Sequence, residues 1–253
     1  MIFVGSPPQR QILARRSEGG SSTAGISSLP TLISCQLHRA EFQQRMDVVR
    51  SLLNAAHPAT GATLHPDISK EARGLAVLLL YAAYENLLTT LSRSLLESAT
   101  RLHVGNRRLR NGFKIFAVHS MLQSTSDSPQ TAIWRSGLDL METLSDGRRC
   151  TISPNLFPND GTNFRRSQVQ TFCNVYGLPD PGPVLREVWS RLDTIVIERN
   201  AIAHGGENPG DVGRRYTLAD LNVLVDLWDR RWMEFITWVE NAASSRDFYR
   251  APR

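Results

Sequence analysis

Arg199, Asn200 and His204 lie close together in the sequence and form the set of side chains best suited to chemistry. An arginine can hold two phosphate oxygens at once and can stabilise the charge of a transition state. An imidazole exchanges protons near neutral pH. This set therefore suits the cleavage of a phosphodiester bond. The alternative interpretation is structural, with Arg199 paired to a buried carboxylate and His204 closing a helix.

The segment that carries these residues, 184–206, has the periodicity of an amphipathic helix. Successive helical residues turn by about 100°, which places Arg199 near the centre of the apolar face. That face is formed by Leu185, Val188, Trp189, Leu192, Ile195, Val196 and Ala203. An unpaired buried charge costs several kcal/mol, so Arg199 needs a partner or a cavity. Gly205 and Gly206 follow His204 and are expected to end the helix there.

Helical periodicity recurs along the chain, and no segment has the alternation expected of a strand. The Thr217–Asp220 motif is a capping box that opens the last helix, and Asn163 is expected to cap a helix that stops at Gly177. The sequence therefore predicts an all-α fold, a helical bundle with a long C-terminal helix and no significant sheet. The other helices are expected near residues 36–57, 67–100 and 129–144, the first with an apolar face of Leu37, Phe42, Met46, Val49 and Leu53.

The composition divides the chain into two parts and gives it a basic character. Residues 1–30 are rich in Ser, Gly and Pro, and they are expected to be a flexible tail or upstream sequence from a misplaced start codon. Residues 36–247 are expected to form one helical domain. The formal net charge of +5 favours polyanionic partners such as nucleic acid. Nearly all the basic residues are arginines, which reflects either phosphate binding or a GC-rich genome.

The cysteines and the apolar runs argue against several classes of protein. Cys35, Cys150 and Cys173 are far apart and odd in number, so neither a zinc site nor a disulfide framework is supported. We expect no metal and no cofactor. The most apolar run, residues 75–84, is shorter than the roughly 20 residues that span a bilayer, and no signal peptide is recognised. These features predict a cytoplasmic protein without membrane contact.

The string from Arg199 to His204 resembles the signature of the HEPN superfamily, an Arg followed by a polar residue and, slightly more than one helical turn later, a His. The apolar segment 77–91, which contains Glu85, is similar to an early helix of that superfamily. The segment 171–179 and the motif helix after it resemble the RiboL-PSP-HEPN branch. The resemblance covers roughly residues 67–242.

This resemblance implies a helical bundle that pairs as a two-fold homodimer, with the motif helices of both copies in one cleft. It implies that Arg199 and His204 are catalytic and that Asn200 orients or supports them. Many HEPN domains are metal-independent RNases that act as toxins or phage-defence effectors, so the leading prediction is an endoribonuclease with an RNA substrate and an antitoxin or defence partner. The alternatives are a non-catalytic HEPN module that binds RNA or a partner protein, and a structural adaptor with an accidental motif.

Two weaker signals complete the predicted site. Glu85 lies about 100° from the centre of its helix stripe, where it is either the buried partner of Arg199 or a solvated flank charge. A basic cluster downstream is either an RNA-backbone contact or solvated surface. That basic cluster consists of Arg107, Arg108, Arg110 and Lys114.

Overall fold

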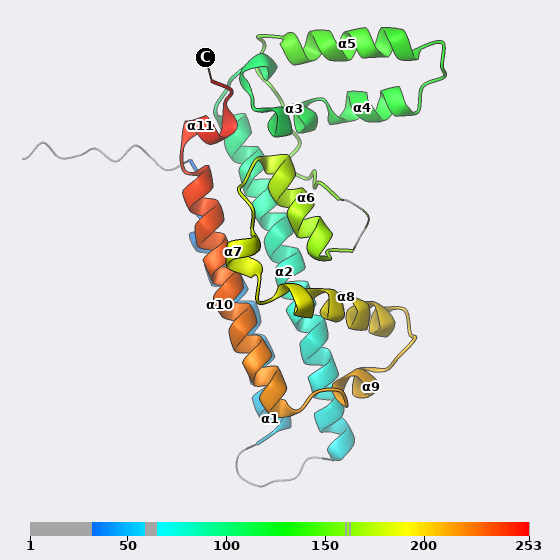
Figure 1. Cartoon of the computed structure of the whole chain (residues 1–253), viewed down its shortest axis with the longest axis vertical. Coiled ribbons are helices and arrows are strands. Elements are labelled where there is room, and N and C mark those ends of the chain that lie inside the picture. Colours follow the sequence, from blue (N-terminus) through cyan, green and yellow to red (C-terminus); the bar gives the residue numbers. More distant parts are fainter. Residues whose placement is uncertain (1–31, 59–64, 160, 162, 253) are drawn as a thin grey trace, which may run out of the picture. The chain divides into compact units, whose positions relative to one another are not determined.

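The computed structural model describes residues 32–58, 65–159, 161 and 163–252, all within one unit of the chain. These residues form eleven α-helices and one 3-10 helix, and they contain no strand (Figure 1). Within them, extended pairing is limited to two isolated bridges, Gly105 to Arg149 and Leu109 to Arg250. The predicted all-α class is therefore confirmed. The predicted tail, residues 1–30, lies outside the described residues.

The centre of the bundle is α2 (Pro66–Arg101), which contacts α1 (Gln36–Ala56), α8 (Trp189–Ala203), α9 (Pro209–Gly213) and α10 (Leu218–Ala243) (Figure 1). Because neighbours cover several of its sides, its buried residues extend well beyond one face. The predicted stripe is buried along its whole length. It consists of Val77, Leu80, Tyr81, Tyr84, Leu88, Leu91 and Leu95.

The other two long helices follow the predicted pattern with one error. In α1 the predicted face is buried except for Leu37, which is 82% exposed. The prediction for Leu37 was wrong because, at about 100° per residue, Leu37 lies on the opposite side of α1 from Met46. His38 points inward instead, and its Nε2 lies 3.1 Å from Ser94 Oγ. In α10 the capping box forms as predicted, because Thr217 Oγ1 accepts from the Asp220 N–H at 3.1 Å and the Asp220 carboxylate accepts from the Thr217 N–H at 3.1 Å.

Helix α2 is also, by length and composition, the one described helix that could cross a membrane. The sequence prediction considered only the ten most apolar residues, whereas the helix continues for 36. Within its most apolar window, 56% of the residues are buried inside the protein. A helix at the centre of a bundle has the same character.

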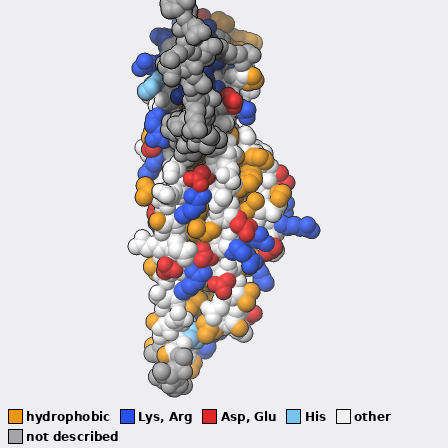
Figure 2. Space-filling model, turned by 90° about the vertical axis from the view of Figure 1, so that its left-hand side faces the viewer, with side chains coloured by type: hydrophobic (Ala, Val, Ile, Leu, Met, Phe, Trp, Pro, Cys, Tyr) orange, Lys and Arg blue, Asp and Glu red, His pale blue; other side chains and the backbone are white. Residues whose placement is uncertain are grey.

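Ion pairs join α1 to α10 along one face of the bundle. Arg50 contacts Asp229 at 2.7 Å and Asp226 at 3.1 Å, and Arg39 pairs with Glu240. Figure 2 shows the basic and acidic side chains alternating over this face. Exposed pairs of this kind contribute about 0–1 kcal/mol each, so apolar burial between the helices remains the main source of stability.

The contact between α2 and α9 brings two backbones together. A Cβ added at Gly74 would lie 1.9 Å from the Pro209 carbonyl oxygen, and one at Gly213 would lie 1.9 Å from the Lys70 carbonyl oxygen. No side chain fits at either position, so glycine permits the close approach. The sequence prediction did not include α9, which starts at a cap where the Asn208 side chain accepts from the Asp211 N–H at 2.8 Å.

Two predictions about the segments before the motif were wrong. The expected single helix through residues 184–204 is divided into α7 (Gly182–Leu185) and α8 by a turn at 186–188. In that turn the Val188 N–H bonds to the Leu185 carbonyl, three residues back, so the α-helical ladder is interrupted. The preceding helix, α6 (Arg166–Tyr176), starts after Asn163, whose φ of +52° is incompatible with its predicted role as the cap. Gly177 ends α6 in the left-handed conformation, as predicted.

The remaining short helices lie at one end of α2. Helix α4 (His119–Ser126) and α5 (Ile133–Ser145) form a hairpin beside α3, and α5 also contacts η1 (Figure 1). The other members of this group are η1 (Asn106–Arg108), α3 (Asn111–Ala117) and α11 (Arg246–Tyr249).

Candidate functional site

Arg199 lies where α8 packs against α2. Its guanidinium carbon is 4.4 Å from the centre of the Tyr81 ring on α2, and its side chain is half-buried. One Nη1–H donates to the amide oxygen of the neighbouring Asn200 at 2.9 Å. The aromatic face attracts the cation without neutralising it. Most of the donor groups of Arg199 therefore remain available to an anion.

Glu85 is linked to Arg199 only through Tyr81. The Tyr81 hydroxyl donates to Glu85 Oε1 at 3.0 Å, and burial followed by the nearby Glu85 charge raises the pKa of Tyr81. The positive charge of Arg199 opposes that rise. Among the described residues no ion pair joins Glu85 to Arg199. The structure therefore brings the predicted supporting residue close to the arginine, with a tyrosine between them.

His204 follows the last residue of α8 as its C-terminal cap, where the sequence placed the helix end. Its backbone N–H donates to the Asn200 carbonyl at 3.0 Å. The side chain is exposed, and nothing in the described part of the chain forms a hydrogen bond or ion pair with the imidazole. Helical geometry separates His204 from Arg199 by about 7.5 Å along the axis and about 140° around it. One α8 therefore presents the two groups in different directions.

The predicted apolar face of α8 is covered by its own chain except at Ala203, which is exposed. Leu192, Ile195 and Val196 are buried, and α8 contacts α2, α6 and α9. The dimer expected from the resemblance therefore cannot rely on this face, and it has to use other surfaces near the end of α8.

An aromatic loop borders the Arg199 position. Phe164, at the end of the irregular stretch before α6, has its ring 6.5 Å from that of Tyr81. The Tyr84 hydroxyl donates to the Phe164 carbonyl at 2.7 Å. The irregular stretch therefore returns to the tyrosine that supports Arg199, a contact that the sequence does not indicate.

On another side of α8, Glu198 forms a second cluster that the sequence analysis missed. Its side chain is only 4% exposed and accepts from the Tyr216 hydroxyl at 2.6 Å. Arg215 contacts Glu198 at 3.5 Å and Glu207 at 2.5 Å. Burial, with the hydrogen bond to Glu198 next in size, raises the pKa of Tyr216. This cluster ties α8 to the segment between α9 and α10, and the sequence carried no periodic signal for it.

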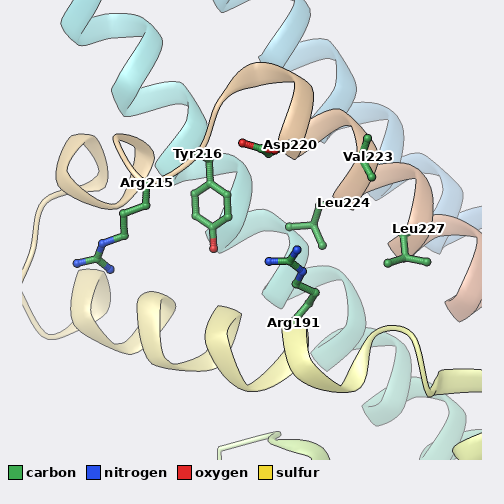
Figure 3. Close-up of a pocket in the computed structure, with 7 residues that line it drawn as sticks. All are labelled: Arg191, Arg215, Tyr216, Asp220, Val223, Leu224 and Leu227. Carbon is green, nitrogen blue, oxygen red and sulfur yellow. The ribbon is translucent and has the colours of Figure 1, made fainter.

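Beside this second cluster, a pocket of about 380 Å³ opens between α8 and α10. Figure 3 shows Tyr216 directing its hydroxyl toward α8, while Arg191 extends from α8 toward α10. Apolar side chains of α10 complete the wall, among them Leu224 and Leu227. None of the predicted catalytic residues lines this pocket, so it lies apart from the motif.

The basic cluster lies far from Arg199. It follows the C-terminal end of α2, and the twenty residues from Tyr81 to Arg101 correspond to about 30 Å of helix. Arg107 and Arg110 are exposed, and Arg108 and Lys114 are half-buried. The two isolated bridges bring the backbones of Arg149 and Arg250 beside the same segment. No acidic side chain pairs with the four predicted residues in the part that the structure describes.

The arrangement of α8 against the buried α2, with an arginine inside the contact and a histidine at the helix end, can be compared with known families. The RiboL-PSP-HEPN family profile matches residues 40–227. The chain belongs to the RiboL-PSP-HEPN family. No curated protein and no solved structure shows significant similarity to it. The HEPN superfamily is generally associated with nucleases, and this family points to an RNase-like or RNA-related function.

The HEPN match spans α2, α8 and the start of α10, so it includes every residue of the predicted site. Around that site, the described residues contain no group of three or more His, Cys, Asp or Glu side chains that could hold a metal ion. What the HEPN motif offers here is a fixed guanidinium and an accessible imidazole.

Proposed function

We propose that this HEPN protein is a metal-independent endoribonuclease. The observation that supports this most is the state of Arg199. It is half-buried and stacked on Tyr81, yet it has no carboxylate partner among the described residues. A cation held in this way is pre-organised for a phosphate, because its geometry is set before the ligand arrives and its charge is not used elsewhere.

The proposed reaction uses the RNA as its own nucleophile. A base takes the proton from a 2′-hydroxyl, the 2′-oxygen attacks the adjacent phosphorus, and the bond to the 5′-oxygen breaks. An acid protonates that leaving oxygen, which yields a 2′,3′-cyclic phosphate and a free 5′-hydroxyl. Arg199 holds the phosphate oxygens as charge develops, and His204 transfers protons. Asn200 orients Arg199 through their hydrogen bond.

Two proton transfers in one step need two carriers, and one chain supplies a single motif histidine. We propose that a two-fold dimer provides the second His204 and sets the histidine of one copy opposite the arginine of the other. The separation of Arg199 and His204 around α8 supports this arrangement, because an exposed imidazole at a helix end can reach outward. We further propose a cytoplasmic toxin or phage-defence effector, controlled by an antitoxin or defence partner.

The decisive experiment incubates the purified protein with labelled RNA and with DNA of the same sequence in excess EDTA. We expect only RNA to be cut, with 2′,3′-cyclic phosphate ends. His204→Ala should slow cleavage by about 100-fold or more, the usual contribution of a general acid or base. His65→Asn, which changes the exposed histidine that caps the N-terminus of α2, should leave the rate unchanged.

Activity that requires magnesium, or products with 5′-phosphate ends, would contradict the proposed chemistry. RNA binding without cleavage by wild-type protein would instead indicate the non-catalytic HEPN module. In cells, expression should slow growth, and His204→Ala should relieve the effect. Equal inhibition by wild type and a folded His204→Ala variant would contradict the toxin role.

We propose that the basic cluster contacts the RNA backbone away from the cleavage site. Its side chains have no acidic partner among the described residues, and the backbones of Arg149 and Arg250 from two other segments lie beside it. Each phosphate contact with a single strand contributes about 0.7 to the slope of log affinity against log salt. The double variant with Arg107→Gln and Arg110→Gln should bind RNA more weakly and reduce that slope by about 1.4. The control Arg230→Gln changes an arginine of α10 that lies near Glu187, and it should leave the slope unchanged. An unchanged slope in the double variant would contradict this contact.

A further inference from the structure

Helix α5 exposes an apolar stripe that the proposed function does not use. Trp134 is 83% exposed, Leu138 is 66% exposed and Met141 is 61% exposed. At about 100° per residue they lie within about 60° of one another on one side of the helix. Three large apolar side chains exposed side by side are characteristic of an interaction surface.

The stripe does not attach α5 to its own chain. Attachment uses other sides of the helix, where α5 contacts α4 and η1. The Thr143 carbonyl, on the side opposite to Trp134, accepts from Asn106 Nδ2 at 3.0 Å. In Figure 1, α5 lies at the edge of the molecule, next to α4. The apolar side is therefore free to meet another molecule.

Two charged residues flank the stripe on the same edge. Arg135 and Glu142 are exposed, and neither forms an ion pair within the described ranges. Both lie about 70–90° from the centre of the stripe. They are seven residues apart, and the midpoint between them falls between Leu138 and Asp139, in the middle of the stripe.

This pattern complements itself in one geometry. A two-fold axis through the midpoint places two α5 helices antiparallel, with the same edges side by side. Arg135 then meets the partner's Glu142, and Glu142 meets the partner's Arg135. Trp134 covers the partner's Met141, and Leu138 packs on the partner's Leu138. A parallel pairing would place these edges on opposite sides of the contact and leave both charges without a partner.

We propose that α5 is a self-association surface at which a second copy of this chain binds antiparallel. The two Trp134 side chains alone would bury about 150–250 Å² each, so the contact falls in the small interface class of less than roughly 1,200 Å². Association through α5 is therefore reversible and depends on concentration. It is separate from the dimer proposed for catalysis, and the two interfaces together would build a larger assembly.

The test measures mass by sedimentation velocity across a concentration series. Arg135→Glu and Glu142→Arg each create two like-charge contacts, and each should weaken association by at least about tenfold. An equimolar mixture of the two variants should recover it, because every contact between the unlike chains is then attractive. The double variant carrying both changes should recover it alone. Arg230→Glu, a charge reversal at an exposed arginine of α10, is the control and should change little.

A wild-type mass that does not rise with concentration would overturn the proposal, as would single variants that associate normally. A mixture that associates no better than either variant alone would also overturn the proposal, because the pairing of Arg135 with the partner's Glu142 would then play no part in the association. Trp134→Ala should abolish association through α5 and leave the dimer proposed for catalysis, and circular dichroism distinguishes this loss from unfolding. None of these readouts depends on RNA cleavage.

Discussion

Two clusters of the same three residue types lie on different sides of α8 and start at adjacent residues. Arg199 rests on Tyr81, whose hydroxyl donates to Glu85. Glu198, the preceding residue, accepts from Tyr216 and contacts Arg215. Each cluster therefore combines an arginine, a tyrosine and glutamate, with Glu207 as a second glutamate beside Arg215, but the connections differ.

In the Glu198 cluster the arginine contacts carboxylates directly and the buried glutamate is satisfied. In the Arg199 cluster the tyrosine lies between the arginine and the glutamate. The first arrangement uses its charges to hold segments together, and the second leaves a cation available. Residue type alone does not distinguish the two clusters; the order of the contacts does.

The largest expected difference between the clusters is in activity. Arg199→Ala should slow RNA cleavage by about 100-fold or more, because it removes the donors that stabilise developing phosphate charge. Arg215→Ala removes an arginine from the other cluster and should change the rate of the folded protein less than about threefold. Single-turnover cleavage measures both. Similar losses in both variants would show that the two clusters are not functionally distinct.

Stability should respond in the opposite order. Glu198→Ala leaves the Tyr216 hydroxyl without its acceptor, and we expect the free energy of unfolding to fall by about 2 kcal/mol. Glu85→Ala also removes an acceptor, that of the Tyr81 hydroxyl, but Glu85 is half-buried and water can replace its carboxylate, so the cost should be less than about 1 kcal/mol. Urea denaturation followed by circular dichroism measures this. A larger loss for Glu85→Ala would reverse the assignment of the structural cluster.

In the Arg199 cluster, the contribution of the Tyr81 ring can be separated from that of its hydroxyl. Tyr81→Leu removes the cation–π contact, worth about 0.5–2 kcal/mol, so RNA affinity should fall several-fold. Tyr81→Phe keeps the ring and loses only the bond to Glu85, so affinity should stay within about twofold. Fluorescence anisotropy with labelled RNA compares them. If Phe proves as harmful as Leu, the hydroxyl positions Arg199 instead of the ring.

At alkaline pH the two clusters should behave alike. In the folded protein, burial raises the pKa of both Tyr81 and Tyr216 above the ordinary value. A raised pKa contributes stability that is complete below the unfolded pKa of about 10 and is lost as pH rises beyond it. The free energy of unfolding should therefore decline above this pH. Tyr81→Phe and Tyr216→Phe should each reduce the decline, and an unchanged slope would contradict the role of these tyrosines.

Periodicity was enough to predict the buried stripe of α2, because a long helix repeats its apolar positions many times. It also located Arg199 within an apolar face and His204 at a helix end, since Gly205 and Gly206 stop the helix. It could not show that the partner across the contact would be a tyrosine ring. That depends on how α8 crosses α2, which no local pattern specifies.

The missed features share a cause. Helix α9 has only five residues and is held by backbone contact, so it has no apolar repeat to detect. No sequence pattern indicated that Glu198 is buried, because its hydrogen-bond partner Tyr216 lies in a turn beyond α9. The break between α7 and α8 depends on hydrogen bonding at Val188 that the composition of the segment does not indicate.

The glycine contact between α2 and α9 has a consequence for genetics. Helix α9 starts only five residues after His204, so the packing of α9 against α2 restricts the position of the His204 imidazole. Any side chain at Gly74 or Gly213 would force α9 away. If the protein is toxic, a screen for harmless mutants should recover substitutions at both glycines as readily as at Arg199 or His204. Such alleles would resemble active-site mutations in phenotype while leaving every reactive group in the sequence.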